Sequence, residues 1–418
     1  MVSQPGLARR LGLSDAVVIG LGSMIGAGVF AAFAPAAQAA GGALLLSLAL
    51  AGLVAFCNAT SSAQLAAIYP TSGGSYVYGR QELGPWWGFA AGWCFVIGKT
   101  ASCAAMALTF ASYAVPWPQW RRPVAVAAVL AITAVNYRGI TRTARLSRAI
   151  VAVVLAVLGL AVVLGLGLSG TAAQPMDFGT GWGPAGVLQA GGLLFFAFAG
   201  YARIATMGEE VRDPQRTIPR AIVLALGMAL AVYLLVAWML LRTLGPAELA
   251  TSAAPIADAM VAVGAEWAAP IIGVGAAVAA LGSLLSLIAG VGRTGLAMAR
   301  ERDLPGWLAA VHPRYRVPHH AEIALGLVVS VLVLLFDLRS VIGFSSFGVL
   351  LYYGIANASA FRQVNGRRYP RGLQLLGLAL CLLLAVTLPW QSVAAGAAVL
   401  LTGLAGRAVV LGRGAADR

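Results

Sequence analysis

The first long apolar segment of this chain, residues 15–39, is long enough to cross a lipid bilayer but carries helix-weakening residues at its centre. Its central run, Gly22–Phe30, contains three glycines and a serine. Glycine weakens a helix, and no water inside a bilayer can satisfy the backbone groups that a break releases. Such a break is tolerated where it lines a cavity, so the segment predicts the substrate site of a secondary transporter. Close packing of helices around glycine is the alternative interpretation.

The composition indicates a membrane protein, since 60% of the residues are hydrophobic and 10% are charged. Apolar segments follow one another closely and predict about twelve spans. They cover roughly residues 15–39, 42–68, 86–115, 122–137, 146–168, 187–207, 219–241, 267–291, 321–336, 340–361, 372–388 and 390–406. The connections are too short for a soluble domain, and we expect no cleaved signal peptide. Residues 1–418 are therefore predicted to form one all-α transmembrane domain.

The net charge of +14 is distributed as in a membrane protein rather than as in a nucleic-acid-binding protein. If the N-terminus is cytoplasmic, most arginines face the cytoplasm, and only Arg121, Arg122, Arg242 and Arg339 face outward. This asymmetry follows the positive-inside rule and predicts that both termini are cytoplasmic, in a bacterial-type inner membrane. The expected partners of the basic loops are anionic lipid headgroups, not nucleic acid.

A second span, residues 187–207, is also interrupted by glycine, at Gly191, Gly192 and Gly200. Two broken spans five apart are typical of an inverted repeat. We therefore predict one repeat over residues 15–168, a second over 187–361, and two extra helices in 372–406.

Charged residues follow the second broken span directly. Arg203, Glu209 and Glu210 lie close together in the sequence and predict an inner gate that opens during transport. Ordinary surface ion pairs, each of which adds under roughly 1 kcal/mol, are the alternative.

Lys99, the only lysine in the chain, lies near the middle of the third span. An ionisable group at that depth is costly and indicates function. A buried lysine can release its proton, whereas an arginine cannot. Lys99 is therefore a candidate proton carrier, and a structural lysine with its amine hydrogen-bonded is the alternative.

Several motifs resemble those of the amino acid–polyamine–organocation superfamily, and most closely its bacterial amino acid permeases and its branch similar to cationic amino acid transporters. These motifs are Gly22–Phe30, Tyr69–Tyr76 with Gly92-Trp93, Phe195–Pro219, Arg293–Pro305 and Tyr352–Asn357. The resemblance implies a leucine-transporter-like fold with a five-plus-five inverted repeat, broken helices one and six, and two C-terminal helices. It also implies alternating access around a central amino-acid site.

The resemblance places the substrate site at the two breaks. The matching positions are Ile25, Gly26, Ala27 and Gly28 in the first span and Phe196, Ala197 and Ala199 in the sixth. Free N–H groups of the first break would bind the substrate carboxylate, and free carbonyls of the second would bind its ammonium group. The small side chains of Ala27 and Ala199 carry no charge, which favours a neutral, apolar amino acid.

The coupling ion is either a proton or sodium. Some proton-coupled members of the superfamily carry a lysine in the fifth span, where this chain has Val154 at or near that position. Lys99 in the third span is the candidate for proton coupling, while the hydroxyls of Ser283 and Ser286 are candidate sodium ligands. The four cysteines show no metal-ligand spacing, so we expect neither a metal nor another cofactor.

Other functions are compatible with the same spans. The protein could export or exchange hydrophobic amino acids, or carry polyamines or other amines, although we find no acidic residue at the candidate site to pair with an amine. A channel or an intramembrane enzyme is a more remote alternative, since the sequence shows no nucleophile–base pair or metal cluster at membrane depth. The sequence does not predict the oligomeric state.

Overall fold

The computed structural model describes residues 11–69, 73–139, 144–168, 183–205, 207 and 211–416. This part of the chain is helical, and its only strand-like pairing is an isolated bridge between Leu11 and Val211. The all-α prediction is therefore confirmed.

The helices follow the predicted spans in order. The first half comprises α1 (Leu13–Met24), α2 (Ala27–Ala31), α3 (Phe33–Ala40), η1 (Gly41–Ala43), α4 (Leu44–Ile68), α5 (Ser75–Glu82), α6 (Pro85–Ala114), α7 (Pro118–Tyr137) and α8 (Ala144–Leu168). The second half comprises α9 (Pro184–Phe198), η3 (Ala199–Tyr201), α10 (Ala202–Ala205), α11 (Pro214–Thr243), α12 (Gly245–Thr251), α13 (Pro255–Ala262), η4 (Glu266–Ala268), α14 (Ala269–Arg300), η5 (Gly306–Ala309), α15 (His319–Leu335), α16 (Leu338–Arg362), α17 (Arg371–Thr387) and α18 (Trp390–Ala416).

Nine helical segments in the described residues are long and apolar enough to cross a membrane. Helices α15 and α17 are apolar but have 17 residues each, and α7 carries the charged pair Arg121 and Arg122 near its start. The protein is thus a multi-pass membrane protein, while the count of twelve spans stays a prediction. The short helices α5, α12 and α13 fall in connections where the sequence analysis expects no helix.

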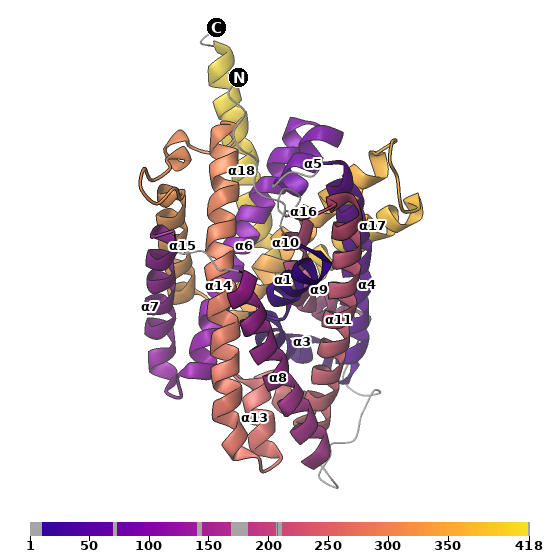
Figure 1. The fold of residues 1–418 in the computed structure, drawn as a ribbon, viewed down its shortest axis with the longest axis vertical. Coiled ribbons are helices and arrows are strands. Elements are labelled where there is room, and N and C mark those ends of the chain that lie inside the picture. Colours follow the sequence, from indigo (N-terminus) through magenta and orange to yellow (C-terminus); the bar gives the residue numbers. More distant parts are fainter. Residues whose placement is uncertain are drawn as a thin grey trace.

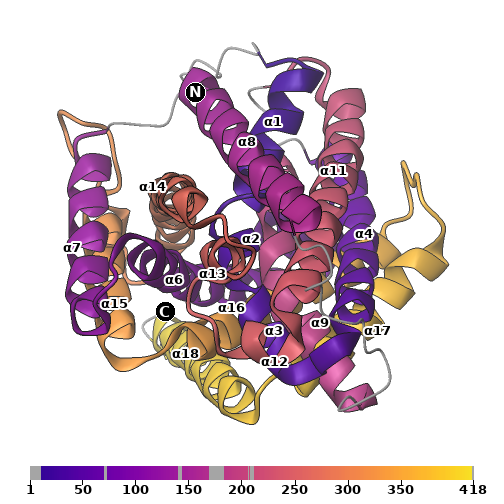
Figure 2. The same cartoon turned by 90° about the horizontal axis from the view of Figure 1, so that it is seen from below.

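The long helices run roughly side by side along the vertical axis of Figure 1. Helix α6 packs against both α14 and α16, and α4 packs against α9 and α11. Seen along the bundle in Figure 2, α7 and α15 lie together at one side and α17 at another. The short helix α2 lies inside the bundle, where it contacts α6, α9 and α14.

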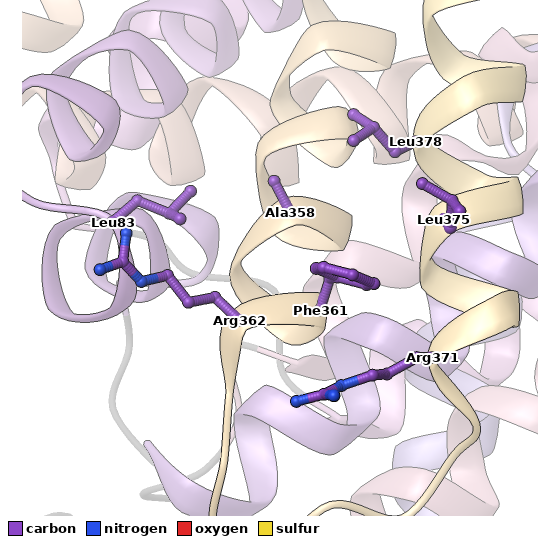
Figure 3. A pocket seen from close by; sticks show the side chains of 7 residues that line it. All are labelled: Leu83, Ala358, Phe361, Arg362, Arg371, Leu375 and Leu378. Atoms are coloured by element: carbon purple, nitrogen blue, oxygen red, sulfur yellow. The ribbon is translucent and has the colours of Figure 1, made fainter.

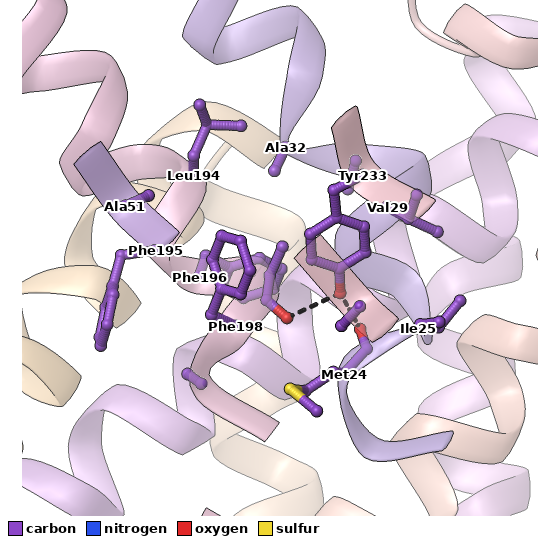
Figure 4. Packing of buried hydrophobic residues seen from close by; sticks show 14 of the residues in the cluster. Met24, Ile25, Val29, Ala32, Ala51, Leu194, Phe195, Phe196, Phe198 and Tyr233 are labelled. Carbon is purple, nitrogen blue, oxygen red and sulfur yellow. Dashed lines mark hydrogen bonds between the residues drawn. The ribbon is translucent and has the colours of Figure 1, made fainter. Parts of the chain in front are cut away.

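Both predicted helix breaks are confirmed. Helix α1 ends at Met24, and Ile25 and Gly26 adopt non-helical backbone angles before α2 begins. Helix α9 ends at Phe198 and passes through the tighter turn η3 into the four-residue helix α10. Figure 4 shows that the first break faces the end of α9, with Ile25 and Phe196 among the side chains around it. The inverted repeat that would relate the two halves stays a prediction.

The two breaks pack backbone against backbone, which explains the glycines. A Cβ atom on Gly28 would lie 2.7 Å from the Cα of Ala197, and one on Gly200 would lie 2.0 Å from the carbonyl oxygen of Ser23. Real Cβ atoms do not approach other atoms so closely, so only glycine fits at either position. These glycines therefore lie at or beside the helix interruptions and also allow the two helices to touch, as the packing interpretation expects. The substrate site stays a prediction.

A buried ion network joins α5, α6, α18 and the segment after α14, at the end of the bundle where α5 lies (Figure 1). Arg407 of α18 forms an ion pair with Asp303, in which its Nη1 atom lies 2.8 Å from Oδ1. The guanidinium of Arg407 also lies 4.8 Å from the ring centroid of Phe89 in α6. Tyr76 and Arg80 of α5 contact the other carboxylate oxygen of Asp303 at 2.8 and 3.4 Å.

The Tyr76 hydroxyl remains a donor in this network. Burial, together with its hydrogen bond to Asp303, raises the pKa of Tyr76 above its ordinary value. Both Asp303 and Arg407 have less than 10% of their side-chain surface exposed. Because the pair is buried, removing one charge leaves the other without compensation.

Replacing Gly28 by alanine should disturb the contact between the two breaks, because the added methyl group would overlap the backbone of Ala197. Overpacking of this kind costs about 1–3 kcal/mol. We expect a lower apparent melting temperature in detergent. The matched control is Gly227→Ala in α11, where a Cβ atom meets nothing within 4 Å. Equal melting temperatures for the two variants would contradict the proposed close packing.

Replacing Asp303 by asparagine should destabilise the protein by roughly 3 kcal/mol, since Arg407 would then be a buried charge without an anion. Asp213→Asn is the control, because its contact with Arg216 at 3.9 Å is solvent-exposed and should add less than about 1 kcal/mol. Thermal unfolding followed by tryptophan fluorescence measures both. Similar stability losses in the two variants would show that burial of the Asp303 pair has no special effect.

Candidate functional site

One tyrosine joins the two helix breaks. The hydroxyl of Tyr233, on α11, lies 2.6 Å from the carbonyl oxygen of Met24 and 3.0 Å from that of Ala197. Figure 4 shows these two contacts as dashed lines. Each carbonyl belongs to the last turn of a helix that stops at a break, so it lacks a partner within its own helix. Tyr233 therefore supplies a donor to backbone groups that the bilayer would leave unsatisfied.

Lys99 reaches the second break. Its Nζ atom donates to the carbonyl oxygen of Ala199 at 3.2 Å, and the side chain is buried. The hydroxyl of Tyr353 on α16 donates to the same oxygen at 3.3 Å. The sequence analysis gave Lys99 no partner. The structure brings its amine to the Ala199 carbonyl, the group that the resemblance assigns to the substrate ammonium.

The position of Lys99 depends on the close crossing of α6 and α16. Gly348 and Gly98 face each other there: a Cβ atom on Gly348 would lie 3.0 Å from the Cα of Gly98. The hydroxyls of Ser102 and Ser345 form a hydrogen bond of 2.6 Å one turn further along. Small residues let two membrane helices approach closely, and this approach brings α16 beside the Lys99 side chain.

Ser283 faces the first break, whereas Ser286 does not offer a comparable free hydroxyl. A Cβ atom on Gly26 would lie 2.0 Å from Oγ of Ser283, so the serine touches the unwound backbone directly. This Oγ atom is buried and has no hydrogen-bond partner in the described structure. Ser286 donates to the carbonyl of Gly282 in its own helix, as serines within membrane helices often do.

The remaining predicted substrate residues are brought together and are buried. Ile25, Ala27, Ala197 and Ala199 are each at most 5% exposed, and Phe196 is 7% exposed. The site is thus closed in this structure. Its surroundings are aromatic: Tyr353 stacks on Tyr201 at a centroid distance of 4.9 Å and meets Phe195 edge-on at 5.8 Å.

A further tyrosine joins the segment after the first break to two other helices. The hydroxyl of Tyr113, at the end of α6, donates to the carbonyl of Phe30 at 3.2 Å and accepts from the N–H of Ile256 at 3.3 Å. The Tyr113 ring also meets the Phe30 ring edge-on, with centroids 5.5 Å apart. This contact links α2, α6 and α13 just beyond the first break.

Sequence analysis missed the tyrosines 113, 233 and 353 as site residues. Tyr353 belongs to a motif that carried the resemblance, but no role was assigned to it. A phenol within an apolar span was the available signal, because a buried hydroxyl requires a partner. The partner in each case is a backbone carbonyl from a segment distant in the sequence, which no local pattern reveals.

The predicted gate is only partly described. Arg203 lies in α10, directly after the second break, and its side chain is partly buried. Glu209 and Glu210 lie outside the described residues, so the gate formed by these three residues stays a prediction.

No carboxylate among the described residues contacts the candidate site. Asp15 lies at the start of α1, where it pairs with Arg148 and accepts from the N–H of Gly12. The buried Glu322 lies against Gly292 between α15 and α14. A cationic substrate side chain would therefore find backbone carbonyls and aromatic rings at the site, but no anion.

The comparisons with known proteins agree with this arrangement. The profile of the amino acid permease family matches residues 11–405. An uncharacterized transporter of Mycobacterium tuberculosis is 62% identical over 400 residues, which cover 96% of this chain and 90% of the relative. The branched-chain amino acid permease BcaP of Bacillus subtilis is 27% identical over 95% of this chain and 92% of its own length. Cationic amino acid transporter 7 of Arabidopsis thaliana is 29% identical over 94% of this chain and 73% of its own length.

The family profile spans both helix breaks, Lys99 and the tyrosines that join them. The relatives are permeases and transporters by name, and none of these names describes an enzyme. The chain therefore belongs to the amino acid permease family, within the amino acid–polyamine–organocation superfamily of membrane transporters.

Proposed function

We propose that this protein is a secondary active transporter that moves neutral, apolar amino acids across the cytoplasmic membrane by alternating access, coupled to protons. The observation that carries the proposal is the pair of facing helix breaks, whose backbone groups are held at the centre of the bundle without any nearby carboxylate among the described residues. Backbone N–H groups suit a carboxylate, and backbone carbonyls suit an ammonium group, so the pair matches the part that all amino acids share.

The lack of an anion supports a neutral side chain. A buried cationic group without a partner carries a desolvation cost that an apolar side chain avoids. BcaP is named a branched-chain amino acid permease, which fits a neutral substrate. The Arabidopsis relative is named a cationic amino acid transporter, which does not. We prefer the neutral substrate because Ala27, Ala197 and Ala199 surround the breaks with apolar side chains.

Lys99 supports coupling to protons. Its ammonium group and the ammonium group of a bound amino acid would compete for the same acceptor, the carbonyl of Ala199. Two cations beside one carbonyl repel each other, so substrate binding favours loss of the lysine proton. Ser283 alone offers a free hydroxyl near the first break, whereas a sodium ion requires several oxygen ligands. Proton coupling therefore explains Lys99 and its contact with Ala199, whereas sodium coupling would explain only the free hydroxyl of Ser283.

The substrate class is tested by ligand-induced thermal stabilisation of the purified protein. Leucine, isoleucine or valine should raise the melting temperature more than arginine, lysine or putrescine, because only the cationic ligands bring a charge that finds no anion at the site. A ligand present at 100 times its Kd stabilises by about 2.7 kcal/mol. The Gly28→Ala variant, in which the two breaks are pushed apart, is the control and should lose the ligand-induced shift. Stabilisation chiefly by arginine or putrescine would refute the neutral substrate.

The role of Lys99 is tested by uptake into proteoliposomes with imposed proton or sodium gradients. In the wild type, substrate affinity should rise with pH, because the uncharged lysine leaves the Ala199 carbonyl to the substrate. Lys99→Met should bind substrate with no such pH dependence, whereas Lys99→Arg retains the charge at every pH and should abolish coupled turnover. A neutral control is Thr100→Val, since Thr100 bonds only to its own helix.

Two results would contradict this role of Lys99. The first is sodium-driven uptake that does not change with pH. The second is an arginine variant as active as the wild type, which would make Lys99 a structural residue that only satisfies the break.

A further inference from the structure

A hollow lies away from the candidate site, between the end of α16, the start of α17 and the end of α5 (Figure 3). It has a volume of about 490 Å³, within the range of small-molecule sites in proteins. Its walls are formed by Leu83, Ala358, Phe361, Arg362, Arg371, Leu375 and Leu378. Five of these seven side chains are apolar, and the two polar ones are both arginines.

The apolar part of the hollow belongs to the outer surface of the bundle. Leu375 is 57% exposed and Phe361 is 42% exposed, and both belong to helices that we assign to the membrane. Leu376, Leu382 and Leu383 of α17 are also exposed. In a membrane protein such a surface contacts lipid chains rather than water.

The arginine-rich segment between α16 and α17 divides into two pairs. Arg367 donates to the carbonyls of Phe361 and Gln363, each at 2.8 Å, and so caps the end of α16. Arg368 donates to the carbonyl of Gln215 at 2.6 Å. These two side chains are used within the fold.

Arg362 and Arg371, the other pair, line the hollow. Neither forms an ion pair with a carboxylate in the described residues. The Arg371 guanidinium lies 5.7 Å from the ring centroid of Phe361. Figure 3 shows Arg371 reaching under Phe361 and Arg362 lying on the side of Leu83. Glu82, which directly precedes the lining residue Leu83, already accepts a hydrogen bond of 2.9 Å from Tyr69. The mouth of the hollow is therefore positively charged and lacks an anion.

The hollow also lies at the boundary of the apolar region. Helix α17 begins at Arg371, so its first turn adds the partial positive charge of a helix N-terminus beside the guanidinium groups. Basic pockets between membrane helices at the cytoplasmic side are suited to anionic lipid headgroups. Our predicted topology places this end of the bundle at the cytoplasmic leaflet.

We propose that this hollow binds one anionic phospholipid, with the headgroup phosphate between Arg362 and Arg371 and an acyl chain against Leu375 and Leu378. Arginine pairs with phosphate oxygens through two parallel N–H groups, and two arginines on opposite walls can hold one phosphate from both sides. A lipid seated there contacts α5, α16 and α17 together. It would therefore stabilise the helix that carries Tyr353, independently of which substrate the protein transports.

The test measures lipid retention by native mass spectrometry on the full-length protein in detergent, with phosphatidylglycerol or phosphatidylcholine added at equal concentration. We expect one phosphatidylglycerol molecule to be retained in preference to phosphatidylcholine. The double variant Arg362→Gln/Arg371→Gln should lose most of that preference, at least about fivefold, because it removes both charged contacts with the headgroup. Arg300→Gln is the matched control, an exposed arginine at the end of α14 that does not line the hollow.

A second variant separates the lipid from a free anion. Leu375→Gln leaves both arginines in place but makes the apolar wall polar, and it should weaken phosphatidylglycerol retention while the protein stays folded, since Leu375 is exposed. Inorganic phosphate at millimolar concentration should not displace the lipid. The proposal is overturned if the double arginine variant retains phosphatidylglycerol as well as Arg300→Gln does. It is also overturned if free phosphate displaces the lipid completely, which would indicate a simple anion site.

Discussion

The structure depends on one contact, the backbone-to-backbone approach of two interrupted helices. Gly28 lies against Ala197, and Gly200 lies against Ser23, at distances that leave no room for a side chain. Because α1 stops at Met24 and α9 passes into the tighter turn η3 after Phe198, the last carbonyls of both helices lose their helical partners where water cannot satisfy them. Tyr233 bridges two of these carbonyls, and Lys99 and Tyr353 meet at a third. The same breaks leave further backbone groups at the centre of the bundle, and the proposed function assigns the amino-acid substrate to them.

The buried charges of the Asp303–Arg407 pair and of Lys99 differ in how they are compensated. Asp303 and Arg407 form a buried pair that joins α5, α6, α18 and the segment after α14, and each charge is compensated by the other. Lys99 is buried without any described carboxylate nearby, and its ammonium group rests on a single carbonyl shared with Tyr353. A paired charge at the edge of the membrane is typical of a structural element. An ionisable group within a membrane span and without an anion is typical of a functional site, which is why we propose a coupling role for Lys99 and a stabilising role for Asp303.

A similar contrast, between arginines that bind backbone carbonyls and arginines that do not, is found at the hollow between α16 and α17. In the short loop before α17, Arg367 and Arg368 cap backbone carbonyls, while Arg362 and Arg371 line an apolar hollow without an anion. The positive-inside distribution explains why arginines are found in this loop at all, but it does not distinguish residues that hold the fold from residues that are available to a lipid. That distinction depends on which side chains find carbonyls in neighbouring helices.

The sequence by itself determined the helical membrane class, the order of the apolar helices and the two glycine-interrupted helices. These properties follow from hydrophobic length and from local backbone preference, which adjacent residues carry. Only the tertiary structure decided that Lys99 meets Ala199 and that Ser283 touches Gly26, while Ser286 bonds to its own helix. It also decided that Tyr113, Tyr233 and Tyr353 donate to backbone carbonyls around the two breaks. Each of these contacts joins residues from different helices. Their formation depends on how closely glycines such as Gly98 and Gly348 let two helices approach, a property of the packed bundle that no single segment contains.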